Sequence, residues 1–146
     1  MNDNAAAADE FQPNLAVADD GTVSVDFYDR RLACPTAGNE ADAAGLALDA
    51  NQPYGASNYC VNASIQFYTP TLAPLEHNIR LTAHTWDPQL NSPHPETPSD
   101  PTGFIGDYFG NVANGLNEIS TFVSTFDDGG NPAHRQQQIV ASVAIP

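Results

Sequence analysis

Alternation of apolar and polar residues is the most regular pattern in this chain. Apolar side chains occupy every second position over residues 22–28 and again over 61–68, which is the period of a strand with one buried face. Shorter runs of strand character cover residues 14–18, 78–84, 104–112, 119–126 and 136–145. No long segment has a helical period, although residues 41–50 are compatible with a short helical turn. The pattern predicts an all-β chain with roughly seven strands.

Turn residues and proline separate these runs. Asp19-Asp-Gly21 predicts a tight turn between the first two strands. Two long loops are expected at about residues 32–60 and 86–103, the second because its five prolines cannot take part in regular ladder pairing. Residues 1–10 are rich in Ala and Asp and are expected to be disordered, so that residues 11–146 form the folded part.

Two distant segments resemble each other. Gly21-Thr-Val-Ser-Val-Asp-Phe-Tyr-Asp-Arg-Arg31 and Ile119-Ser-Thr-Phe-Val-Ser-Thr-Phe-Asp127 are both β-rich and both contain an aromatic residue followed by Asp. We interpret them as one antiparallel four-stranded unit of about 45–50 residues used about twice, in preference to a seven-strand sandwich. Stacked units of this kind normally need neighbours to cover their faces.

The chain is strongly acidic. It carries 18 acidic and 4 basic residues, for a formal net charge of -14, and every basic residue is Arg. Nucleic acids and anionic membrane surfaces both require clustered cations, so the charge argues against either as a partner.

Cys34 and Cys60 are the only cysteines. We expect a disulfide between them, which would stabilise the fold by roughly 3.5 kcal/mol in the chain-entropy model; two buried free thiols are the alternative. A disulfide would indicate an extracellular or cell-surface protein. The first residues lack the basic start and apolar run of an export signal, so we expect that signal to lie upstream.

Four segments together resemble the closing part of a secreted sialidase-like (BNR or Asp-box) β-propeller. They are residues 21–31, Ser64-Ile-Gln-Phe-Tyr68, His84-Thr-Trp-Asp-Pro88 and Phe104-Ile-Gly-Asp-Tyr-Phe-Gly110. The resemblance covers about residues 11–145 and implies the C-terminal blades of a larger propeller. The Asp-box pattern is met only in part by Thr125-Phe-Asp127-Asp-Gly129, and the three Arg of true sialidases cannot be placed.

Candidate catalytic residues follow from this resemblance. Asp107 and Tyr108 lie between Gly106 and Gly110, where close backbone approach is possible. Glu118 is a candidate to activate the Tyr108 phenol as a nucleophile, since sialidases use Tyr where other glycosidases use a second carboxylate. The alternative for Asp107 is a buried side chain that caps backbone N–H groups.

Candidate substrate-binding residues lie at two strand ends. Tyr28, Asp29, Arg30 and Arg31 combine a phenol, a carboxylate and two guanidiniums, which bind the carboxylate of an acidic sugar in bidentate fashion. The alternative is an Asp–Arg pair that fixes the turn. Trp86 and Asp87 suit stacking on a sugar face; alternatively, Trp86 anchors the following loop to the sheet.

No cofactor is expected. His84, His94 and Asp87 lack a recognisable metal-ligand spacing, and Asp127-Asp-Gly-Gly-Asn131 resembles a calcium-binding turn but is better interpreted as an ordinary hairpin loop.

Two functions are therefore expected. The first is part of a sialidase-type glycoside hydrolase acting on acidic sugars, inactive as an isolated fragment. The alternative is a non-catalytic secreted or surface propeller that binds a glycan or protein through its loops. The expected partners are a carbohydrate or glycoprotein, together with the remaining blades or a second copy.

Overall fold

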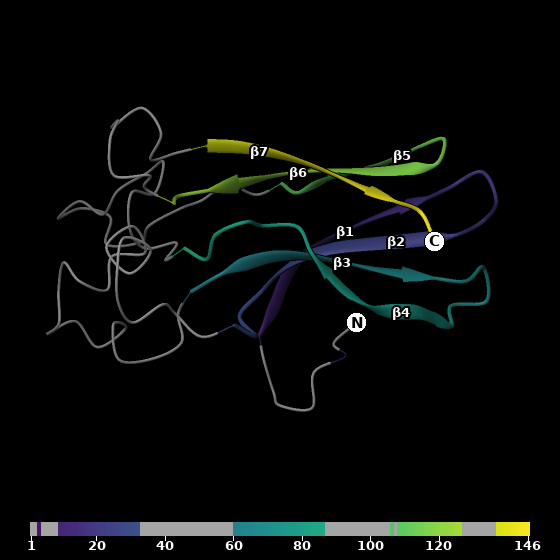
Figure 1. Ribbon diagram of the computed structural model, residues 1–146, viewed down its shortest axis with the longest axis horizontal. Helices are drawn as coiled ribbons and strands as arrows, with labels where there is room; N and C mark the ends of the chain where they lie inside the picture. Colours follow the sequence, from purple (N-terminus) through teal and green to yellow (C-terminus); the bar gives the residue numbers. More distant parts are fainter. Residues whose placement is uncertain (1–2, 4–8, 33–59, 87–105, 107, 127–136) are drawn as a thin grey trace, which may run out of the picture.

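The computed structural model describes residues 3, 9–32, 60–86, 106, 108–126 and 137–146. These residues form two antiparallel sheets and contain no helix (Figure 1). The first sheet has the order β1 (Glu10–Val17), β2 (Val23–Asp29), β3 (Asn62–Tyr68) and β4 (Pro74–Arg80). The second has the order β5 (Gly110–Asn114), β6 (Asn117–Ser124) and β7 (Gln137–Ala144). The all-β, antiparallel prediction is confirmed, whereas the propeller-blade type stays a prediction.

Most strands lie close to their predicted positions, and β4 and β5 are the exceptions. β5 spans residues 110–114, whereas the sequence pattern predicts 104–112. β4 spans residues 74–80, whereas the apolar pattern predicts 78–84. The β3–β4 turn sets this register, because the Thr69 N–H donates to the Ala73 carbonyl at 2.8 Å and Tyr68 pairs with Pro74 directly afterwards. The predicted helical turn at 41–50 lies outside the described residues.

The β1–β2 hairpin is built as its turn residues predict. The Gly21 N–H donates to the Ala18 carbonyl at 2.9 Å, and Gly21 has a positive φ of 88°. An added Cβ there would lie 3.0 Å from the Pro70 side chain, so both the conformation and the space favour glycine.

A bulge in β1 connects the two sheets. Its register with β2 shifts between Phe11 and Asn14, and Gln12 has a φ of 50°. Pro13 is tolerated there because β1 is an edge strand of its sheet. The Gln12 side-chain amide donates to the Gly106 carbonyl at 2.6 Å, and the Asn14 amide donates to the Phe109 carbonyl. β1 is therefore fastened to the segment that leads into β5.

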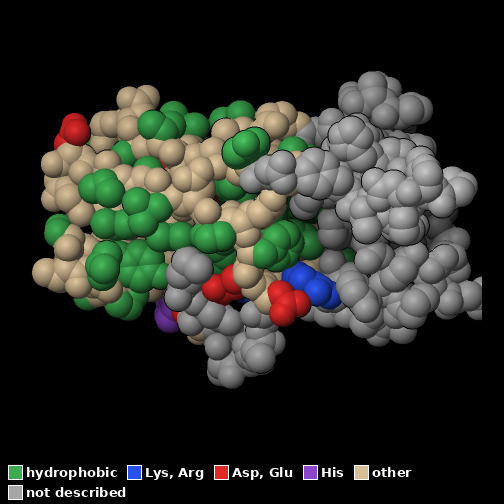
Figure 2. All heavy atoms as spheres, turned by 180° about the vertical axis from the view of Figure 1, so that it is seen from behind, with side chains coloured by type: hydrophobic (Ala, Val, Ile, Leu, Met, Phe, Trp, Pro, Cys, Tyr) green, Lys and Arg blue, Asp and Glu red, His purple; other side chains and the backbone are tan. Residues whose placement is uncertain are grey.

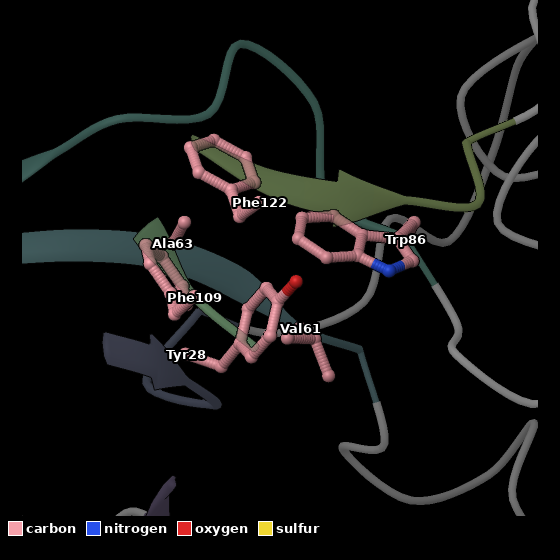
Figure 3. Close-up of a cluster of buried hydrophobic side chains, with 6 residues drawn as sticks. All are labelled: Tyr28, Val61, Ala63, Trp86, Phe109 and Phe122. Atoms are coloured by element: carbon pink, nitrogen blue, oxygen red, sulfur yellow. The ribbon is translucent and has the colours of Figure 1, made fainter. Parts of the chain in front are cut away.

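The two sheets lie face to face, with an aromatic core between them. The core consists of Tyr28, Val61, Ala63, Trp86, Phe109 and Phe122 (Figure 3). The opposite face of β2 forms a separate buried cluster with Tyr68. It consists of Val23, Val25 and Phe27, which alternate with the residues that face β6. Both faces of β2 are thus covered, so every residue of this strand is buried.

The two ends of the sheets differ in the length of their connections. Short turns at 18–22, 69–73 and 115–116 join β1 to β2, β3 to β4 and β5 to β6 at one end. At the opposite end, β2, β4 and β6 finish and β3, β5 and β7 begin after longer stretches of chain (Figure 1). All three long connections therefore leave from and return to the same end. Within the described part of the chain, no helix is long and apolar enough to cross a membrane.

Candidate functional site

Tyr28 lies at the centre of the contact between the sheets. Its ring packs edge-on against Phe109 and Trp86, with centroids 4.8 Å and 5.7 Å away (Figure 3). Its hydroxyl donates to the Val123 carbonyl at 2.9 Å and accepts from the Val123 N–H at 3.0 Å. Burial raises the pKa of this phenol to about 12, so it remains a donor at neutral pH. Tyr28 thus lies inside the fold, away from any ligand at the surface.

Trp86 is also part of the core. Its side chain is fully buried, and its backbone forms a bridge with Val61 in which the Val61 N–H donates to the Trp86 carbonyl at 2.7 Å. This bridge fastens the segment that ends at Trp86 to the residue that precedes β3. Asp87 lies outside the described residues.

Arg31 belongs to an ion-pair network. Its guanidinium lies 2.8 Å from the Asp3 carboxylate and 3.2 Å from the carboxylate of the buried Asp29, which also accepts from the Ser64 hydroxyl. The Asn78 N–H donates to Asp3 at 2.9 Å and is the main reason why the pKa of that carboxyl is lowered. The network joins the start of the chain to β2, β3 and β4.

Arg30 has a carboxylate partner of its own. Its guanidinium lies 2.9 Å from Asp9. Figure 2 shows blue Arg atoms next to red acidic side chains on one face. Because Asp9 and Asp3 lie beside the two guanidiniums, the positive charge of this strand end is neutralised by the protein itself. This is the geometry of a structural Asp–Arg pair, the alternative to binding an acidic sugar.

The candidate catalytic residues lie in different environments. The Glu118 side chain is 1% exposed and faces the first sheet, whereas Tyr108 is 88% exposed. Asp107 lies outside the described residues. The Glu118 carboxyl, which was expected to activate the Tyr108 phenol, is therefore buried, whereas the phenol is exposed to solvent.

Asp26 is a functional candidate that the sequence analysis did not identify. Its side chain is fully buried and faces Glu118 on the second sheet. Burial raises the pKa of Asp26 to about 7, the nearby Ser120 hydroxyl opposes this rise, and Glu118 adds to it. Burial also raises the pKa of Glu118. The sequence offered one signal for this candidate: the carboxylate of Asp26 lies between Val25 and Phe27, in a strand whose other face is apolar.

The remaining candidates concern metal binding. Among the described residues, no group of three or more His, Cys, Asp or Glu side chains is arranged to hold a metal ion. His84 stacks on Phe126, with ring centroids 4.1 Å apart. His94 and the turn at 127–131 lie outside the described residues. Cys60 is buried, but Cys34 is outside the described part, so the disulfide stays a prediction.

No family model, curated protein or solved structure matches this chain.

Proposed function

We propose that the chain is a non-catalytic β-domain of a secreted or surface protein, which binds its partner through the long connections at one end of its sheets. The observation that carries this proposal is the asymmetry of the two ends. Tight turns close one end, and the segments 33–59, 87–105 and 127–136 all start and finish at the other. Binding residues are disproportionately found on loops that a rigid sheet scaffold holds together.

The positions of the chemically active side chains support binding over catalysis. Tyr28, Trp86 and Glu118 are all 1% exposed or less, so none presents its functional group to a substrate at the surface. A general acid or base must come within hydrogen-bonding reach of the atom that it protonates or deprotonates. In the described residues these side chains instead fill the space between the sheets.

The charge of the long connections narrows the class of partner. The three segments carry eight acidic residues and a single Arg. A sialic acid carboxylate would be repelled by this field, because Arg30 and Arg31 are already paired with carboxylates. A neutral glycan or a positively charged protein surface is therefore favoured over an acidic sugar.

The sialidase-like propeller remains the second candidate, and one observation favours it. Each sheet is a meander whose strands follow in sequence order, and β2 of the first sheet faces β6 of the second through Tyr28 and Val123. Neighbouring blades of a propeller would also place equivalent strands opposite each other. In that case further blades would cover the outer faces of both sheets.

Glycan-array binding and sialoside turnover by the full chain test the two candidates together. Binding to neutral glycans or to basic proteins, with no turnover of a fluorogenic sialoside, supports the proposed binding domain. Turnover that is lost in Tyr108→Phe would replace it with the enzyme.

A pair of variants locates the binding surface. In the first, residues 88–105 are replaced by a Gly-Ser linker of equal length, which should abolish binding. In the matched control, Leu72→Ser changes an exposed residue of the tight-turn end and should bind normally. Near-ultraviolet circular dichroism of Trp86 verifies that both variants fold. Loss of binding in the Leu72 variant alone would contradict the assignment of the surface.

A further inference from the structure

Polar side chains fill the part of the space between the two sheets that the aromatic core does not occupy. We call them the inter-sheet polar cluster, and they are Ser24, Asp26, Asn111, Glu118 and Ser120. The Asn111 amide donates to the Ser24 hydroxyl at 3.3 Å, and Asn111 is paired with Ser120 across β5 and β6. β2 therefore contributes to the cluster from the first sheet, and β5 and β6 from the second.

Several oxygen atoms of this cluster are buried without a hydrogen bond of normal geometry, with the Ser120 hydroxyl beside Asp26 and the Ser24 hydroxyl beside Glu118. They are both carboxyl oxygens of Asp26, Oε1 of Glu118 and Oδ1 of Asn111. Asp26 is 0% exposed and Glu118 is 1% exposed, so bulk solvent does not reach these side chains. Buried polar atoms normally have a partner, and a group of unpartnered acceptors facing one another points to a missing positive charge.

The described cations do not supply that charge. Arg30 is paired with Asp9, and Arg31 is paired with Asp3 and Asp29. Arg80 donates to Thr82, Thr85 and the Ala83 carbonyl. None of the ion pairs in the described part of the chain includes Asp26 or Glu118.

We propose that the inter-sheet polar cluster binds one calcium ion, with Asp26 and Glu118 as anionic ligands and the Asn111 amide oxygen as a neutral ligand. The hydroxyls of Ser24 and Ser120 are further donors. Calcium prefers oxygen ligands of this kind and accepts about six to eight of them in flexible geometry, whereas magnesium retains several waters and zinc favours nitrogen and sulfur. Two carboxylates neutralise one divalent ion, and the ion joins β2 to the second sheet.

This site differs from the turn at 127–131, and it does not depend on the proposed binding function. Its role is to fasten one sheet to the other. Because the ligands come from strands far apart in the sequence, the site exists only in the folded state, and calcium must therefore stabilise the fold.

Thermal unfolding of the full chain in EDTA, in calcium chloride and in magnesium chloride tests the proposal. We expect the Tm to rise with calcium in a saturable way, by about 10 °C when calcium exceeds its dissociation constant about a hundredfold. Magnesium should have a much smaller effect. Equal Tm values in EDTA and calcium would overturn the proposal.

Variants assign the effect to this cluster. Asp26→Asn keeps the shape of the side chain and should abolish the calcium-induced shift without destabilising the protein in EDTA, since it removes an unpaired buried charge. The matched control Glu76→Gln changes an exposed acid of β4 and should keep the full shift. A calcium-induced Tm shift that persists in Asp26→Asn but disappears in the double variant Asp127→Asn/Asp128→Asn would refute this site. It would assign the calcium to the turn at 127–131 instead.

Terbium luminescence provides a direct readout that does not depend on stability. Tyr28 lies on the same face of β2 as Asp26 and contributes to the same electrostatic environment, so its ring is the expected sensitiser of a bound lanthanide. We expect sensitised emission that calcium competes away and that Asp26→Asn lacks. Emission that is unchanged by Asp26→Asn would contradict binding at this cluster.

Discussion

Replacing Tyr28 with Phe tests how the two sheets are held together. β5 pairs with β6 only as far as Thr121, so the peptide groups of Val123 lie beyond the end of that ladder. The Tyr28 hydroxyl serves both of them, at 2.9 Å and 3.0 Å. Tyr28→Phe keeps the ring and its aromatic contacts but leaves one N–H and one carbonyl without a partner.

The expected cost follows from these two hydrogen bonds. An unsatisfied buried backbone group costs about 1–3 kcal/mol, and the Val123 groups are partly buried, so we expect a loss of about 2 kcal/mol in the free energy of unfolding. That corresponds to a fall of roughly 4–8 °C in Tm. The measurement is urea unfolding at neutral pH, where the phenol is protonated because its pKa is about 12. The m-value should not change, since the folded surface is the same.

Tyr68→Phe is the matched control. The Tyr68 ring packs against the Val23–Phe27 cluster, but its hydroxyl makes no hydrogen bond within the described residues. Its removal should change the stability by less than about 0.5 kcal/mol. Hydrogen exchange provides a local readout, because the Val123 amide should lose protection only in Tyr28→Phe. Equal effects of the two substitutions would refute the role assigned to the Tyr28 hydroxyl.

Three further predictions concern charge, redox state and pH. Arg31→Ala should lower the free energy of unfolding in urea by about 3 kcal/mol, because it removes the cation beside the buried Asp29. Arg30→Ala should lower it by less than about 1 kcal/mol, because the Asp9 carboxylate is 74% exposed. A larger loss in Arg30→Ala than in Arg31→Ala would contradict the network. Cys34→Ser should lower the Tm only under oxidising conditions; an equal shift with reductant present would argue against the disulfide. In EDTA, the free energy of unfolding should fall by up to about 4 kcal/mol as the pH rises from about 4 to 7. The reason is that the pKa of Asp26 is about 7 in the folded state and 3.8 in the unfolded state, so unfolding releases a proton in this pH window. This slope should be markedly smaller in Asp26→Asn, where the raised pKa of Glu118 still contributes to it. A rise in stability over the same window would contradict the assigned pKa of Asp26.

The local pattern predicts strands better than it predicts their partners. The alternation over 22–28 and 61–68 corresponds to β2 and β3, which pair along their whole length. It misplaces β4, because the polar residues 76–78 interrupt the alternation between Leu75 and Ile79, and the register is set by the turn instead. A strand at the edge of a sheet can form on backbone hydrogen bonds alone, without an apolar face to mark it.

The candidate site was the less predictable part. Tyr28, Trp86 and Glu118 have side chains suited to catalysis or sugar binding, and composition does not distinguish such residues from core residues with the same chemistry. Asp26 lies between two apolar residues, and the sequence pattern does not show whether its face of the strand is covered. Only the second sheet, whose strands lie far away in the sequence, makes that position interior.

The amino-acid sequence by itself determined the β character of the chain, the Gly21 turn and the acidic charge, because each depends on residues within a few positions of one another or on a simple sum. The tertiary structure alone decided which faces are covered. A strand has two faces, and its own residues do not specify what will pack on either. That choice put the phenol of Tyr28 against Val123 and the carboxyl of Asp26 opposite Glu118, and it turned expected surface chemistry into the interior of the fold.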